Sequence, residues 1–116
     1  MTREEMQLRT KDFARRILAV VDELPQGKPS AKAIAMQLAR SGTSVAANYR
    51  AAGRGRSKAE FIAKLGIAEE EADESLLWLE LMAEHKLLPT KRLAAIIQEA
   101  KEITAIIVAS KKSARR

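Results

Sequence analysis

The fold is decided by residues 57–84, which read SKAEFIAKLGIAEEEADESLLWLELMAE. Ser57 and Glu60 have the spacing of a capping box, in which each side chain bonds a free backbone N–H group at the start of a helix. Beyond them, apolar residues recur every three or four positions, which is the period of one face of an α-helix. This seam comprises Phe61, Leu65, Ala68, Ala72, Leu76, Leu79 and Met82 or Ala83. The pattern predicts one long amphipathic helix over about residues 58–86.

Three turns rich in proline or glycine divide the rest of the chain. They lie at residues 24–29, 53–56 and 87–90. The segments between them carry apolar residues at the helical period, which predicts helices over about residues 3–24, 31–52 and 91–110. Thr2 and Glu5 form a second capping box, and Ser30 is a suitable N-cap for the second helix. Strand-like alternation is nearly absent, so the sequence predicts an all-α protein.

Four amphipathic helices joined by short loops favour an antiparallel, up-down four-helix bundle. The 116 residues are expected to form a single domain, because this length is close to that of a typical domain. Gly42 and Gly66 lie inside predicted helices, where each costs about 1 kcal/mol relative to alanine. We interpret both glycines as positions where another helix approaches closely, and a kink in the helix is the alternative.

The composition excludes several classes of protein. Hydrophobic residues make up 47% of the chain and charged residues 31%, as in folded soluble proteins. Cysteine is absent, which excludes disulfides, a thiol nucleophile and thiolate metal sites. Neither a membrane-spanning apolar run nor a signal peptide is present, so we expect a cytoplasmic protein with no membrane partner.

The net charge points to a class of partner. The chain carries a formal charge of +6 and has a pI of about 9.9, which favours a polyanion such as RNA or DNA. A simple role of this charge in solubility is the alternative. Aromatic residues make up only 3%, which argues against RNA-recognition or single-strand-binding modules that stack bases on several rings.

The charges are divided between two neighbouring predicted helices. Residues 30–58 contain six cationic side chains and no acidic one, whereas residues 59–88 contain eight acids and two lysines. Glu70 and Glu74 share one helical row, where like charges destabilise a helix unless cations lie opposite. Arg40 and Arg50 are the expected cations, from the same chain or from a neighbouring subunit. A metal site in the acidic run is the weaker interpretation.

The helix predicted at residues 58–86 has more apolar surface than one seam requires. A helix in a monomeric bundle buries a stripe about 100° wide, and Leu77, Trp78 and Leu81 lie outside that stripe. We expect these side chains to form a subunit interface with charged residues at its rim, which makes the protein a homo-oligomer. The predicted interface residues are Leu77, Trp78, Leu81, Arg40, Glu70 and Glu74. Burial of this helix at the centre of one subunit is the alternative.

A basic cluster marks the turn between the second and third predicted helices. Gly53 and Gly55 let the backbone approach a ligand closely, and the helix start that follows offers free N–H groups to an anion. The candidate nucleic-acid-binding residues are Arg50, Arg54, Arg56 and Lys58. The turn matches no phosphate-loop fingerprint. The C-terminal residues 111–116, KKSARR, are also basic, and we expect them to be a frayed tail.

The sequence offers no catalytic or metal site. No nucleophile, base or ligand set can be assembled, so we expect a protein without cofactor or metal that is not an enzyme. His85 is the only histidine and lacks the partners that a metal ion needs. Ser41 and Asn48 fall on the apolar row of the second helix, and we interpret them as a structural polar core that sets helix register. A catalytic role for Asn48 is the alternative.

Three segments resemble a known family. They are LARSGTSVAAN at residues 38–48, RSKAEF at residues 56–61 and LGIAEE at residues 65–70. In combination they resemble the four-helix-bundle proteins associated with intervening sequences in bacterial 23S ribosomal RNA genes. The resemblance covers residues 34–82 well and the outer helices by pattern only. After the asparagine this family usually has Ile-Ala-Glu-Gly, whereas this chain has Tyr49-Arg50-Ala51-Ala52 and so lacks the acid.

The resemblance implies an assembly and partners. Related bundles form homopentameric barrels, so a homopentamer is expected here. One relative, the accessory variability determinant of diversity-generating retroelements, is similar in fold and binds nucleic acid and a reverse transcriptase. The expected partners are therefore other copies of the chain, RNA or DNA, and a reverse transcriptase or another protein. The sequence thus predicts a non-enzymatic oligomeric scaffold or accessory protein that binds RNA or DNA through basic surfaces. The alternative is a protein-interaction ring with no nucleic-acid role.

Overall fold

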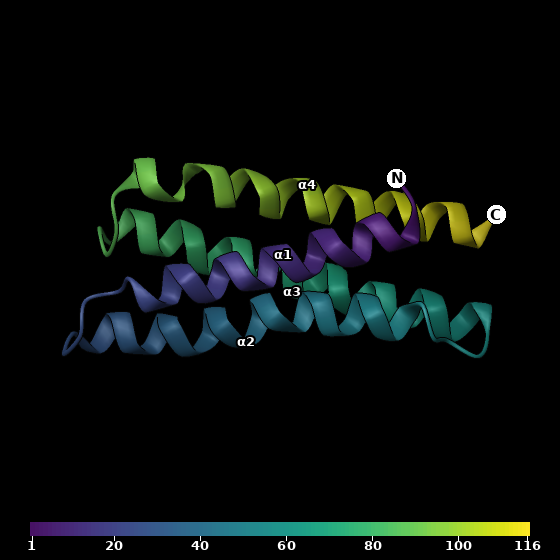
Figure 1. Cartoon of the computed structure of the whole chain (residues 1–116), viewed down its shortest axis with the longest axis horizontal. Coiled ribbons are helices and arrows are strands. Elements are labelled where there is room, and N and C mark those ends of the chain that lie inside the picture. The colour runs from purple at the N-terminus through teal and green to yellow at the C-terminus, as the bar shows by residue number, and fades with distance from the viewer.

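The computed structural model describes all residues from 1 to 116 and contains four helices and no strand. The helices are α1 (Arg3–Asp22), α2 (Pro29–Ala52), α3 (Lys58–Glu84) and α4 (Thr90–Arg115). They run alternately up and down and lie side by side along one long axis (Figure 1). The principal extents are 47 × 21 × 19 Å, so the molecule is a rod that is more than twice as long as it is wide. The predicted all-α, up-down four-helix bundle is confirmed.

Each of the two predicted capping boxes forms in part, because the Thr2 and Ser57 side chains accept their bonds while the Glu5 and Glu60 carboxylates form none to the backbone N–H groups of Thr2 and Ser57. Thr2 Oγ1 accepts a hydrogen bond from the backbone N–H of Glu5 at 3.1 Å, and Ser57 Oγ accepts one from the N–H of Glu60 at 3.0 Å. The predicted cap at Ser30 is wrong, because α2 begins at Pro29, two residues before the predicted start, and its N-cap is Lys28. Proline has a backbone angle suited to the first helical turn and lacks an N–H group that would need a partner there.

The C-terminal helix is longer than the sequence predicts. It continues to Arg115, whereas the sequence predicts an end at residue 110 followed by a frayed tail. Lys111 Nζ donates to Glu69 Oε1 of α3 at 2.8 Å, and the Lys111 side chain is largely buried. This ion pair holds the last turns of α4 against α3. The ends of α1 and α3 differ from the prediction by only two residues, at Asp22 and Glu84.

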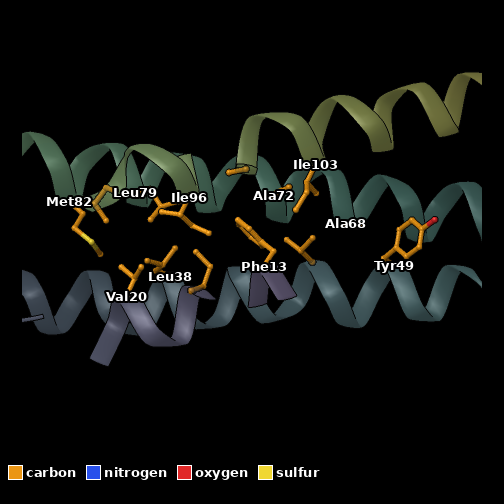
Figure 2. Close-up of a cluster of buried hydrophobic side chains, with 14 of the residues drawn as sticks. Phe13, Val20, Leu38, Tyr49, Ala68, Ala72, Leu79, Met82, Ile96 and Ile103 are labelled. Atoms are coloured by element: carbon orange, nitrogen blue, oxygen red, sulfur yellow. The ribbon is translucent and has the colours of Figure 1, made fainter. Parts of the chain in front are cut away.

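One hydrophobic core runs along the bundle and receives side chains from all four helices (Figure 2). Phe13, Leu38, Leu79 and Ile103 are fully buried and come from α1, α2, α3 and α4 in turn. The prediction that Asn48 belongs to the buried row of α2 is wrong. Asn48 is only partly buried, and its Nδ2 donates within α2 to the carbonyl of Ser44 at 2.9 Å.

The two helix glycines have different surroundings. A Cβ atom at Gly42 would lie 2.7 Å from Cγ2 of Ile17, a fully buried side chain of α1, so α1 and α2 approach closely there. A Cβ atom at Gly66 would meet only Lys111 Nζ, at 3.8 Å. The prediction of a packing glycine is confirmed at Gly42 and wrong at Gly66, because no helix backbone or core side chain lies against Gly66.

Ion pairs close the bundle between its first and last helices. Arg9 of α1 donates to Glu99 of α4 through two hydrogen bonds of 2.7 and 2.8 Å, and to Glu102 at 2.9 Å. Arg92 near the start of α4 bonds Glu23 after the end of α1, with its Nε 2.9 Å from Glu23 Oε1. None of the four helices combines the length and apolar character that a bilayer crossing requires.

Candidate nucleic-acid interface and subunit-contact surface

The bundle gathers basic segments at one end. Because neighbouring helices are antiparallel, the turn between α2 and α3 lies at the same end as the N-terminus and the C-terminus (Figure 1). Cations that are distant in sequence therefore meet there. They come from the start of α1, the turn and the end of α4, and they are Arg3, Arg50, Arg54, Arg56, Lys58, Lys112, Arg115 and Arg116.

The four predicted nucleic-acid-binding residues, Arg50, Arg54, Arg56 and Lys58, are named here the basic turn. All four are exposed, and none forms an ion pair with an acidic side chain. Lys58 Nζ donates only to the main-chain oxygen of Arg116, at 3.4 Å. The structure therefore leaves the four cations without an acidic side-chain partner, and it places Arg56 and Lys58 in one groove and Arg50 beside Gln7 and Lys11.

An open groove of about 880 Å³ lies against the basic turn. Its lining contains Arg3, Arg56, Lys58 and Phe61, and no acidic residue. The Arg3 guanidinium lies over the Phe61 ring, with Cζ 4.6 Å from the ring centroid, which is a cation–π contact. Tyr49 also lines the groove, and burial of this residue raises the pKa of its phenol above the ordinary value.

The sequence reveals this groove only in part. The charge of the turn identifies Arg56 and Lys58 as candidate site residues, but no sequence signal identifies Arg3, Tyr49 or Phe61. Arg3 and Phe61 are far apart in the chain, and only the antiparallel return of the helices places them in contact. The apolar character of Phe61 and Tyr49 indicates core positions rather than a site.

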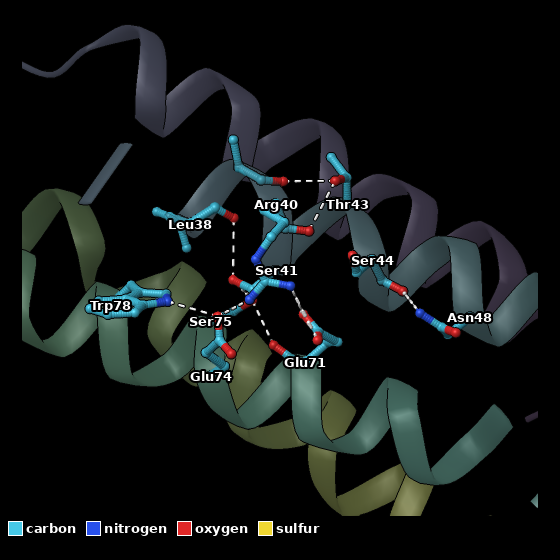
Figure 3. Close-up of polar contacts among 11 residues, drawn as sticks. Leu38, Arg40, Ser41, Thr43, Ser44, Asn48, Glu71, Glu74, Ser75 and Trp78 are labelled. Atoms are coloured by element: carbon cyan, nitrogen blue, oxygen red, sulfur yellow. Dashed lines mark hydrogen bonds and ion pairs between the residues drawn. The ribbon is translucent and has the colours of Figure 1, made fainter. Parts of the chain in front are cut away.

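The basic helix α2 and the acidic helix α3 are joined by a charge network (Figure 3). Arg40 Nη1 lies 3.0 Å from Glu71 Oε2, and Arg40 Nη2 also bonds Glu74. Trp78 Nε1 donates to the same Glu74 carboxylate at 3.1 Å. The hydrogen bond to Glu74 is the main cause that raises the pKa of Arg40. The predicted pairing of Arg40 with the acidic rows therefore forms within the chain.

The other charges predicted to pair between the second and third helices behave differently. Glu70 is exposed and forms no ion pair within the chain, and the same is true of Arg50. The sequence predicts Glu70 and Glu74 in one row opposite a cation. The structure pairs Glu74 and Glu71 with Arg40 instead, because Arg40 reaches the side of α3 that faces α2 while Glu70 points to solvent.

The outer side of α3 carries exposed apolar side chains. Leu77 is 47% exposed and Leu81 37% exposed. Trp78, between them in sequence, is half-buried and packs against the core of its own chain. Burial of α3 at the centre of a single subunit is therefore excluded, since its outer leucines face solvent. We call Leu77, Trp78 and Leu81 the α3 apolar patch.

A buried polar contact joins α2 and α3 at mid-length. The hydroxyls of Ser41 and Ser75 lie 2.8 Å apart, and both residues are fully buried (Figure 3). Ser41 is thus part of a polar core, as the sequence predicts, but its partner is Ser75 and not Asn48. No group of three or more histidine or carboxylate side chains is placed to hold a metal ion.

These features define the class: an up-down four-helix bundle with one strongly basic end and an apolar outer face on its third helix. A family model described as "23S rRNA-intervening sequence protein" matches residues 4–109. The chain belongs to this family, which confirms the resemblance found in residues 34–82. A search of curated proteins found no match.

A solved structure supports the same assignment. It is the crystal structure of a protein of unknown function from the S23 ribosomal protein family of Bacteroides thetaiotaomicron. The two chains are 31% identical and superpose with a TM-score of 0.85, over 97% of this chain and 99% of the other. The likeness therefore covers all four helices, including the outer ones, which the sequence segments alone do not cover.

Proposed function

We propose that the protein is a non-enzymatic oligomeric scaffold that binds RNA or DNA through the basic turn. One observation carries the proposal: Arg50, Arg54, Arg56 and Lys58 are exposed at one end of the bundle, and no acidic side chain pairs with them. Unpaired cations on one surface are the footprint expected of a protein that contacts phosphates.

The distribution of the paired charges supports the same conclusion. Glu69, Glu71 and Glu74 of α3 are the acids of this helix that form ion pairs, and their partners, Lys111 and Arg40, do not belong to the basic turn. The charges that serve the fold and the charges that face solvent are therefore different residues. A protein that used its cations only for internal pairing would leave no such unpaired cluster.

The α3 apolar patch supports a proposal of self-association. Leu77 and Leu81 are exposed side by side on one helical row, next to Trp78, and contiguous exposed apolar groups on a soluble protein mark contact surfaces. We propose a homopentamer, the assembly that the family resemblance implies. Five copies would repeat the basic turn around one axis, so that several weak phosphate contacts act on one strand together.

The test is the salt dependence of nucleic-acid binding by the full-length protein. Affinity should fall steeply as salt rises, because each phosphate contact releases bound counterions. Arg54→Ala combined with Arg56→Ala should lower the slope of log affinity against log salt by about 0.7–0.9 for each phosphate that the two arginines neutralise. The measurement is fluorescence anisotropy with labelled RNA and DNA at several salt concentrations.

A matched control removes the same charge from the opposite end of the bundle. Lys32 and Lys91 are exposed near the starts of α2 and α4, so Lys32→Ala with Lys91→Ala should leave the slope unchanged. Undetectable or salt-independent binding by the oligomer would reject the nucleic-acid role. The second candidate would then stand: an interaction ring whose exposed α3 apolar patch serves assembly alone.

A further inference from the structure

The groove beside the basic turn has the composition of a ligand site. Its volume of about 880 Å³ lies within the range of roughly 300–1,000 Å³ usual for small-molecule sites. Arg3, Arg56 and Lys58 supply positive charge, while Phe61 and Ile106 supply apolar surface. The lining contains no carboxylate that would neutralise the cations, so the groove suits an anion that also has an apolar part.

Tyr49 provides an independent observation at the same place. The residue is only 6% exposed, yet its hydroxyl forms no hydrogen bond with any protein group. No side-chain oxygen sealed inside the protein lacks a partner, so this hydroxyl is accessible to solvent, and Tyr49 is one of the residues that line the groove. Figure 2 shows the ring at one end of the buried cluster, between α2 and α3, with the hydroxyl at its outer tip. A polar group held in this way is ready to bond a ligand.

The two sides of the groove differ in chemistry. Arg56 and Lys58 flank the start of α3, where the N–H groups of Lys58 and Ala59 are free, that of Glu60 is capped by Ser57, and the helix dipole is positive, as a phosphate requires. Phe61 lies one turn further along α3, with the Arg3 guanidinium 4.6 Å above its ring centroid. Aromatic rings and planar guanidinium groups are the surfaces on which nucleic-acid bases stack.

We propose that this groove binds one nucleotide unit, with its phosphate at Arg56 and Lys58 and its base against Phe61 and Arg3. The Tyr49 hydroxyl donates a hydrogen bond to the same unit. The inference rests on the proposed function, since Arg56 and Lys58 belong to the basic turn. It adds that the protein prefers an unpaired nucleotide, because a base inside a duplex is already stacked and cannot enter the groove.

The unit has two sources, a free mononucleotide or an unpaired position in a strand. The probes are therefore AMP, adenosine, inorganic phosphate, a single-stranded oligonucleotide and the duplex of the same sequence. AMP should bind more tightly than adenosine or phosphate alone, because it engages both sides of the groove. The single strand should bind more tightly than the duplex at equal salt. Isothermal titration on the full-length protein measures the small probes, and anisotropy measures the strands.

Two variants remove one feature of the groove each. Phe61→Leu keeps apolar volume but removes the ring, and should weaken AMP and single-strand binding on the order of tenfold. Tyr49→Phe removes only the hydroxyl and should weaken both by roughly fivefold. Duplex binding, which uses the basic turn alone, should change little in either variant. Circular dichroism melting shows whether each variant keeps the fold. If Phe61→Leu does not fold, Tyr49→Phe remains the test of the groove.

The outcomes separate this inference from the proposed function. If strands bind with a steep salt dependence but both variants match the wild type, the groove proposal is overturned and the proposed function stands. If AMP binds and both variants weaken it while no strand binds, the groove takes a free nucleotide and the nucleic-acid role is rejected. If neither AMP nor any strand binds, both are rejected.

Discussion

The hydroxyl of Ser75 in α3 lies 2.8 Å from the hydroxyl of Ser41 in α2, inside a core that is otherwise largely apolar. Ser75 Oγ also lies 2.8 Å from the Glu71 carbonyl, and Ser41 Oγ lies 3.3 Å from the Leu38 carbonyl. These two carbonyls belong to the serines' own helices, so the bond between the hydroxyls is the one bond of the serine pair that joins the two helices. That bond forms only while α2 and α3 keep this register.

The serine pair should show coupled energetics. Ser75→Ala leaves Ser41 with one long bond to its own helix and should lower the free energy of unfolding by about 1 kcal/mol. Replacing both serines by alanine removes donor and acceptor together, so the double variant should lose less than the sum of the single losses. Urea denaturation of the wild type, the two single variants and the double variant measures the free energy of unfolding of each. Strictly additive losses would mean that the Ser41–Ser75 hydrogen bond contributes nothing.

The two helix glycines should respond in opposite directions to alanine. At Gly42 the new methyl group would lie 2.7 Å from Cγ2 of Ile17, whose branched side chain is fully buried and has little freedom to move. Gly42→Ala should therefore lower stability by about 1–3 kcal/mol. Gly66→Ala meets no such contact and should raise stability by about 0.5–1 kcal/mol through helix propensity. Thermal and urea unfolding measure the change in stability of each variant relative to the wild type. Equal changes at the two sites would contradict the structure.

Low pH should destabilise the bundle, because it protonates carboxylates whose ion pairs join α1 and the residue after it to α4. The hydrogen bond from Arg92 lowers the pKa of Glu23, and bonds from Gln98 and Arg9 lower the pKa of Glu102. Their stabilising contribution is complete above the ordinary value of 4.5 and is lost as the pH falls through the lower folded-state values. The melting temperature should therefore decrease as the pH falls below this range.

The same experiment has an internal control. Glu23→Gln with Glu102→Gln removes both titrating groups and should flatten the dependence of the melting temperature on pH in the acid range. Glu84→Gln removes an exposed carboxylate that forms no ion pair, and should leave the dependence as it is in the wild type. If both variants follow the wild-type curve, the ion pairs that Glu23 and Glu102 form do not govern acid stability.

The α3 apolar patch should control the oligomeric state. Leu77→Glu with Leu81→Glu places charge on an exposed face, so the helical content should stay the same while the particle mass falls toward the 12.8 kDa of one chain. Leu8→Glu, at a leucine of α1 that is 69% exposed, is the control and should leave the mass unchanged. Analytical ultracentrifugation decides the question. A wild-type protein that sediments as a monomer would reject the assembly itself.

Helix content and order are predictable because local signals agree with the tertiary arrangement. The caps at Thr2 and Ser57 and the three turns are determined by neighbouring residues, so they depend little on packing. The prediction fails where packing decides. Lys111 extends α4 through its bond with Glu69 on another helix, and Tyr49 takes the buried position that spacing alone allows for Asn48.

The candidate site divides in the same way. The basic turn is predictable, because Arg50, Arg54, Arg56 and Lys58 are close in sequence. The groove is not, because Arg3 and Phe61 meet only when α1 and α3 are brought to one end of the bundle. The low aromatic content of the sequence argues against base stacking and gives no indication of the groove. Composition counts aromatic rings, but it does not show that one ring lies beside unpaired cations.

The sequence by itself determined four amphipathic helices, their order and the separation of positive from negative charge, because helix period, turn residues and charge are local properties of the chain. Only the tertiary structure decided which charges are paired. Arg40 pairs with Glu71 and Glu74 because the antiparallel register of α2 and α3 brings them within reach, while the cations of the basic turn extend past the acidic rows into solvent. Which charged side chains form ion pairs depends on the distance between them, and the packing of the helices sets that distance.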